Sequence, residues 1–134
     1  MGIAAVLRRY ADIATRQAWD EFSEIVLPDA VVTFSFGGTR GSDLELTGPH
    51  GLGELGRAAI GAFTFYLYVP LNSVAELGDD PSTATGRAYA LESAIDHDGN
   101  WIDVYGRYDD DYRRIGDRWM IAGRRYRELV RRVH

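Results

Sequence analysis

The sequence predicts a single α+β domain, a cone formed by a curved antiparallel sheet wrapped around N-terminal helices. Three observations predict it. The chain has 134 residues, the usual size of one domain; helical periodicity is confined to its first half; and strand patterns joined by short turns fill the rest. Consecutive strands of this kind pair antiparallel, and helices segregated from them cover one face of the sheet. We expect one domain over residues 1–134, with an apolar pocket between sheet and helices.

Helical periodicity marks the first half of the chain. The first expected helix carries apolar side chains three and four positions apart and arginines on its opposite side. The second is short and ends before Pro28, and the third has an apolar side but contains three internal glycines, which lower helix propensity. A run of β-branched and aromatic residues between them predicts a strand. The expected elements are helices over residues 3–18, 19–25 and 51–62, a strand over residues 30–36 and a polar loop over residues 39–49.

Strand patterns fill the second half of the chain. The first of these strands is long and aromatic, and Pro70 within it predicts a bulge or an edge position because proline cannot donate to the ladder. Asp98-Gly99 is typical of a tight hairpin turn. The expected strands cover residues 63–77, 83–96, 101–115 and 118–130.

Composition excludes several classes of protein. There is no cysteine, which removes disulfides and thiolate chemistry, and no lysine, which removes Schiff-base catalysis. The net charge of −5 argues against a nucleic-acid partner, and no apolar run is long enough to cross a membrane. The N-terminus lacks the pattern of a signal peptide, so we expect a cytoplasmic protein. Arginine as the sole basic residue type besides histidine favours a GC-rich bacterial source.

Short motifs in a fixed order carry a resemblance to a known family. At the start they are Arg9-Tyr10-Ala11-Asp12, Trp19-Asp20 and Pro28-Asp29-Ala30-Val31, and at the end Gly106-Arg107-Tyr108-Asp109-Asp110, Arg118-Trp119-Met120-Ile121-Ala122 and Arg124-Arg125. In this order and spacing the chain resembles the SnoaL-like branch of the nuclear-transport-factor-2-like superfamily, over nearly its whole length. The resemblance implies a cystatin-like cone whose open end admits a small, mostly apolar molecule, and cofactor-independent chemistry. Relatives include scytalone dehydratases, bile-acid dehydratases, steroid isomerases and polyketide cyclases.

The chain departs from the dehydratase-like members at their catalytic positions. In those members a histidine on the sheet acts as base, an aspartate near the end of the first helix assists it, and tyrosines bind the substrate oxygen. Tyr10 keeps the first-helix tyrosine, but Thr15 stands at the aspartate position. Tyr68 and Tyr89 stand at the two histidine positions. The resemblance therefore implies the pocket but not the histidine–aspartate pair.

Tyrosines are the strongest site signal that remains. Eight occur, and a tyrosine hydroxyl can donate a hydrogen bond to a carbonyl or enolate oxygen while its ring flanks an apolar ligand. The competing interpretation is ordinary core and cross-strand packing. We expect Tyr10, Tyr68 and Tyr89 to orient the substrate oxygen and Arg107 to stabilise developing negative charge. Further substrate-binding candidates are Thr15, Trp19, Tyr66, Asn72 and Tyr105.

The other ionisable residues are interpreted as structural. The chain has three histidines; His97 lies in an expected turn, His134 is terminal, and His50, in a loop, is expected at the surface. Alternation along a strand sends Asp109 and Asp111 to one face and Asp110 to the other, where pairing with arginines is the default expectation. No metal site and no cofactor are expected.

Three functions stay open. The first is a lyase, isomerase or cyclase acting on an oxygenated, largely apolar, polyketide- or steroid-like molecule, in which shape and hydrogen bonding dominate because no histidine base is present. The second is a binding or assembly module without chemistry. The third is an epoxide hydrolase, for which Arg107-x-Asp109 has suitable spacing. A homodimer is expected, formed through an outer sheet face flattened by Ala88, Ala90 and Ala94.

Overall fold

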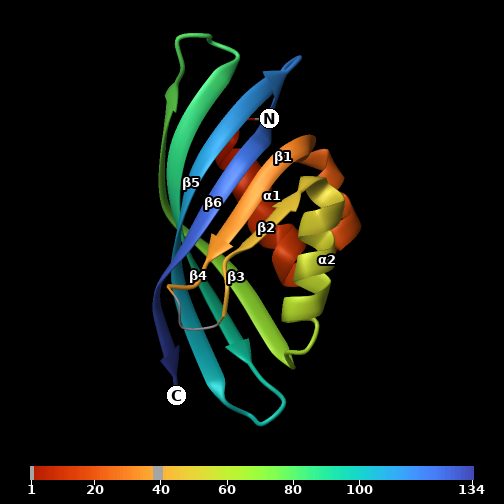
Figure 1. The fold of residues 1–134 in the computed structure, drawn as a ribbon, viewed down its shortest axis with the longest axis vertical. Helices are drawn as coiled ribbons and strands as arrows, with labels where there is room; N and C mark the ends of the chain where they lie inside the picture. The colour runs from red at the N-terminus through yellow and green to blue at the C-terminus, as the bar shows by residue number, and fades with distance from the viewer. Residues whose placement is uncertain (1, 38–40) are drawn as a thin grey trace.

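A computed structural model describes residues 2–37 and 41–134. A six-stranded sheet curves around two α-helices and one 3-10 helix, all on its concave side, as Figure 1 shows. The α+β cone predicted from the sequence is confirmed. The elements in chain order are α1 (Ile3–Arg16), η1 (Trp19–Glu24), β1 (Val26–Ser35), β2 (Leu44–Thr47), α2 (Gly48–Ile60), β3 (Phe65–Leu77), β4 (Thr83–Ile95), β5 (Trp101–Ile115) and β6 (Arg118–Val133).

The sheet has the order β2-β1-β6-β5-β4-β3 and is antiparallel except at one pair. β1 runs parallel to β6, so the expectation of a wholly antiparallel sheet was wrong there. β2 was also missed: it lies in the segment expected to be a loop and pairs with β1. In β3 the register shifts between Pro70 and Ser73, which confirms the bulge predicted at Pro70.

Alternation places small side chains of β4 on the concave side of the sheet. Ala84, Ala88, Ala90 and Ala94 are all buried there, in the core shared with the helices. The expectation that alanines of this strand flatten the outer face was therefore wrong. The assignment was off by one residue, and a shift of one residue moves every side chain of a strand to the other face of the sheet. Small residues on the concave side leave room for an internal cavity.

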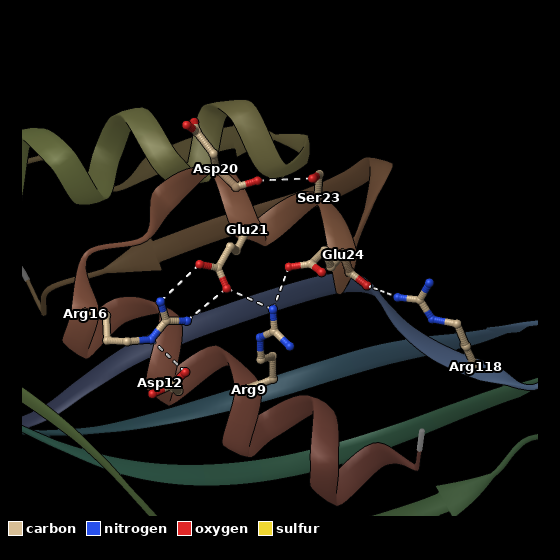
Figure 2. Close-up of polar contacts among 8 residues, drawn as sticks. All are labelled: Arg9, Asp12, Arg16, Asp20, Glu21, Ser23, Glu24 and Arg118. Atoms are coloured by element: carbon tan, nitrogen blue, oxygen red, sulfur yellow. Dashed lines mark hydrogen bonds and ion pairs between the residues drawn. The ribbon is translucent and has the colours of Figure 1, made fainter.

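A network of ion pairs fastens α1 to η1 (Figure 2). Arg16 donates to both oxygens of Glu21 and to Asp12, while Arg9 donates to Glu21 and Glu24. Arg118 of β6 donates to the backbone carbonyl of Glu24. The hydrogen bonds from Arg16 and then Arg9 lower the pKa of Glu21 to about 2.

Replacing Glu21 by glutamine should flatten the acid dependence of stability. The folded pKa of Glu21 lies near 2, below the unfolded value of about 4.3, so its contribution is complete above pH 4.3 and is lost as the pH falls through 2. Urea unfolding of Glu21→Gln between pH 7 and pH 2 should therefore show a shallower loss of stability in that window. Arg16→Gln removes the main cause and should flatten the same window; curves parallel to the wild type would contradict this role.

Candidate functional site

The main cavity lies between the concave face of the sheet and the helices. Its volume is about 150 Å³, and most of its wall is apolar or aromatic, from α1, η1, α2 and the inner faces of β1 and β3–β6. Gly56 of α2 packs directly on the Trp19 ring, where an added Cβ would lie 2.6 Å from Cζ3. The helices and sheet thus close a cavity of the size of a small organic molecule.

Five buried tyrosines line this cavity, Tyr126 of β6 among them. Tyr10, Tyr66, Tyr68 and Tyr108 are buried and line it, and the rings of Tyr10 and Tyr68 lie 5.6 Å apart. Burial raises the pKa of the Tyr10, Tyr66, Tyr68 and Tyr108 hydroxyls, although the charge of Arg124 and then a hydrogen bond with Tyr108 partly offset this for Tyr10 and Tyr68. The hydroxyls therefore stay protonated at neutral pH and can act as hydrogen-bond donors.

The Tyr66 hydroxyl is the one with spare hydrogen-bonding capacity. It is buried and, among the described residues, reaches no partner at hydrogen-bond distance and angle. The Glu92 carboxylate is nevertheless a close neighbour, because it contributes with burial to the raised pKa of Tyr66. Tyr66 and Glu92 interact without ideal hydrogen-bond geometry, so the Tyr66 hydroxyl is suited to donate to a ligand oxygen beside the carboxylate.

Among the residues that the structure describes, Glu92 is the acidic one that lines the main cavity. It shares the inner face of β4 with the buried alanines and lies directly opposite Tyr68 on β3. On the other side it lies opposite Val104 of β5, which in turn lies opposite Arg131 of β6. One row across the sheet therefore presents a hydroxyl, a carboxylate, an apolar side chain and a guanidinium, and Arg131 also lines the cavity.

Sequence reasoning missed Glu92 although a signal was present. Glu92 is an even-numbered residue of a strand whose even-numbered positions are small and apolar. A glutamate in register with alanines that face a core is a candidate for a buried, functional carboxylate. The signal was lost because those alanines were assigned to the outer face.

A buried ion pair lies below the tyrosines. Arg124 and Asp110 are each 1 % exposed, and Arg124 donates to both carboxylate oxygens at 2.8 and 3.2 Å. The guanidinium also lies over the Tyr108 ring, 3.5 Å from its centroid, and over the Tyr10 ring at 4.4 Å. Asp110 was predicted to face away from Asp109 and Asp111, and it does; that its partner is buried with it was not predicted.

The structure separates the predicted site residues into groups. Tyr10, Trp19, Tyr66 and Tyr68 line the main cavity. Thr15 does not: its hydroxyl accepts a hydrogen bond from the Tyr68 backbone N–H at 3.0 Å and fastens α1 to β3. Residues placed elsewhere are Tyr89 and Asn72, which line a second cavity, and Arg107 and Tyr105, which alternate outward on β5.

The Arg107–Asp109 pair, considered for epoxide opening, does not reach the main cavity. Its two side chains contact each other at 2.9 Å and are both partly exposed, on residues of β5 that alternate with the buried ones. This is the ordinary ion pairing on one face of the sheet expected from the sequence, as is the contact between Asp111 and Arg125. The three histidines are all exposed and none lines the main cavity.

Two negative findings concern the described ranges 2–37 and 41–134. They contain no group of three or more histidine, aspartate or glutamate side chains that could hold a metal ion. They also contain no helix long and apolar enough to span a membrane.

Several solved structures have the same fold as this chain, and the descriptions of some of them name an enzyme. A protein of Novosphingobium aromaticivorans DSM 12444, described provisionally as a scytalone dehydratase, is 15% identical, with a TM-score of 0.80 over 97% of this chain and 83% of that one. The hexachlorocyclohexane dehydrochlorinase LinA-type3 of Novosphingobium barchaimii LL02 is 14% identical, with a TM-score of 0.81 over 98% and 87%. A Kribbella flavida protein, Kfla4162, is 23% identical, with a TM-score of 0.78 over 97% and 90%.

The comparison with curated proteins gave no significant match. The comparison with family models gave one that covers most of the chain, a SnoaL-like domain over residues 2–125. Its extent includes every element from α1 to the middle of β6, and with them Glu92, all the cavity tyrosines except Tyr126, and the buried ion pair. The chain therefore belongs to the family of SnoaL-like domains.

Proposed function

We propose that this protein is a cofactor-independent lyase or isomerase that removes a proton from carbon in an oxygenated, largely apolar small molecule. The observation that carries the proposal is Glu92, a carboxylate in the wall of an otherwise apolar, tyrosine-lined cavity. A half-buried carboxylate in such surroundings is a suitable general base, because apolar side chains flank it and it lies close to the bound substrate. This proposal departs from the expectation that shape and hydrogen bonding, and not proton abstraction, dominate catalysis.

The reaction can be written with the residues present. Glu92 accepts the proton from a carbon next to a carbonyl group, and the electron pair of the C–H bond moves onto the carbonyl oxygen to form an enolate. The Tyr66 hydroxyl, with Tyr68 across the strand from Glu92, donates to that oxygen as its negative charge develops. Return of the proton to another carbon gives isomerisation; departure of a leaving group gives elimination.

The names of the structural neighbours favour the same class of chemistry. A dehydratase removes water and a dehydrochlorinase removes hydrogen chloride, and both names appear on proteins with this fold. At 14–15% identity these likenesses establish only the fold, so the reaction class is argued from Glu92 and the tyrosines. A polyketide- or steroid-like ring system in secondary metabolism is our proposal for the natural substrate.

A non-catalytic binding module is the second candidate. The replacement of the family's histidine–aspartate pair by Tyr68 and Thr15 favours it, because such losses keep a pocket while removing a reaction.

We also propose that the protein forms homodimers in the bacterial cytoplasm. Exposed apolar side chains on the convex face offer the contact, among them Phe65, Leu67, Trp101, Tyr105 and Val130.

Replacing Tyr66 by phenylalanine tests the proposed function. Cyclohexanone and 2-decalone serve as probes, and mass spectrometry measures enzyme-dependent incorporation of deuterium from D₂O beside the carbonyl group. The wild type should accelerate exchange for at least one probe, and Tyr66→Phe should slow it about 10- to 100-fold, the cost of one hydrogen bond to a charged oxygen.

The matched control is Tyr105→Phe, which removes the same hydroxyl from the outer face of β5. It should leave the exchange rate unchanged. Saturable binding of both probes without any exchange would favour the binding module, and equal effects of the two substitutions would remove Tyr66 from the mechanism.

A further inference from the structure

A second cavity lies between the N-terminal half of α1 and the bulge of β3, next to the main one. Its volume is about 240 Å³, and Tyr68 lines both cavities. The register shift of β3 between Pro70 and Ser73 is at its wall, so the bulge helps to form it. Neither the proposed reaction nor its residues other than Tyr68 use this space.

A buried guanidinium with an unsatisfied donor contributes to this cavity. Arg124 is 1 % exposed; its Nε and Nη2 atoms donate to Asp110, while Nη1 is buried with no hydrogen-bond partner among the described residues. Arg124 lines the second cavity and not the main one. Packing against the Tyr10 and Tyr108 rings fixes its orientation, so the donor group is held in place before any ligand arrives.

The remaining polar groups around the cavity are suited to a negative charge. Arg8 of α1 is exposed and makes no ion pair with the described residues. Ala4, in the first turn of α1, also lines the cavity. The backbone N–H groups of this turn carry a partial positive charge, and the turn contains no acidic residue. Asn72 and Ser73 add an amide and a hydroxyl, and no acidic residue of the described ranges 2–37 and 41–134 lines this cavity.

The rest of the wall is apolar. Leu7 of α1, Pro70 and Leu71 of β3 and Ala88 of β4 surround the space beside the two arginines. A fully hydrated ion such as phosphate would leave these side chains facing its water, whereas a short hydrocarbon chain would contact them. The combination therefore favours a carboxylate attached to a small apolar body.

We propose that the second cavity binds the carboxylate group of a small organic acid, with Arg124 and Arg8 as its cationic contacts and the apolar wall holding the rest of the molecule. Arginine is suited to this role because its planar fork matches a carboxylate. The site is separate from the proposed chemistry of the main cavity and goes beyond it. It gives this protein a means to respond to, or to require, an acidic metabolite.

Titration with sodium butanoate tests the site, followed by ¹H–¹⁵N spectra of the labelled full chain at low ionic strength. Saturable shifts should centre on the backbone amides of Arg8, Asn72 and Ser73. Butanamide, which has the same shape without the charge, should bind at least tenfold more weakly. Arg8→Gln should weaken butanoate binding about two- to fivefold, the effect of one exposed charged contact.

Arg125→Gln is the matched control, because it removes an equal charge outside the cavity. Arg125 follows Arg124 in β6, lies on the opposite face of the sheet and pairs with Asp111. It should leave the affinity for butanoate unchanged. The proposal is overturned if butanamide binds as tightly as butanoate, if Arg8→Gln and Arg125→Gln have equal effects, or if the shifts centre on Glu92. Tighter binding of inorganic phosphate than of butanoate would overturn the assignment to an organic carboxylate.

Discussion

Replacing Glu92 by glutamine should reduce proton exchange in the main cavity by about 10²- to 10⁴-fold, the usual contribution of a positioned general base. Glutamine has nearly the same shape and keeps an oxygen beside Tyr66, but its amide does not accept a proton at neutral pH. The loss should therefore fall on the turnover rate and not on the affinity for the ketone probe. Deuterium incorporation measures the first quantity, and a fluorescence or calorimetric titration with the same probe measures the second.

Glu54→Gln provides the matched control for this prediction. Glu54 lies on the exposed side of α2, where it pairs with Arg57, so the same chemical change occurs outside the cavity. Its exchange rate should equal that of the wild type. Unchanged exchange in Glu92→Gln would show that the base lies elsewhere, and the binding-module interpretation would then gain weight.

The fold could be predicted largely because its signals are local. The periodicity of α1, the hairpin turns and the proline bulge each depend on a few neighbouring residues, and the structure places them where the sequence indicated. β2 was missed because four residues in a polar, glycine-bearing segment give no alternation to detect. The parallel pairing of β1 with β6 was missed because it joins the first and last strands of the chain through contacts distant in sequence.

The candidate site was only half predictable, for a geometric reason. Tyr10, Tyr66 and Tyr68 line the main cavity because their elements must turn an apolar face inward, which the sequence shows. The face of β4 could not be decided in the same way, since both sets of alternating residues include small or apolar side chains. One choice of register there decided whether Glu92 lay in the cavity or in solvent. Arg124 was missed because a buried cation is visible only when its partner, fourteen residues earlier on the neighbouring strand, is placed beside it.

Replacing Asp110 by alanine should destabilise the fold by about 3–5 kcal/mol. The substitution leaves the Arg124 guanidinium buried without its counter-charge and also removes the acceptor of the Tyr112 hydroxyl, which bonds Asp110 at 2.6 Å. Urea unfolding followed by circular dichroism measures the effect. Breaking a buried pair in this way is costly because the remaining ion cannot regain its hydration.

The neighbouring pair supplies the control. Asp111 follows Asp110 in β5, and Arg125 follows Arg124 in β6. The Asp111–Arg125 contact is 2.9 Å long, but the two side chains are 48% and 52% exposed. Asp111→Ala should therefore cost no more than about 1 kcal/mol. Equal costs for the two alanine substitutions would mean that Arg124 is hydrated in solution and that its pair with Asp110 is not a buried one.

A double substitution separates the charge from the packing. Asp110→Leu together with Arg124→Met removes both ions and keeps apolar volume, so it should recover most of the stability that Asp110→Ala loses. It should at the same time abolish butanoate binding in the second cavity, because the fixed donor is gone. A stable double variant without anion binding would indicate that the buried pair is kept for a ligand, since apolar residues would serve the fold equally well.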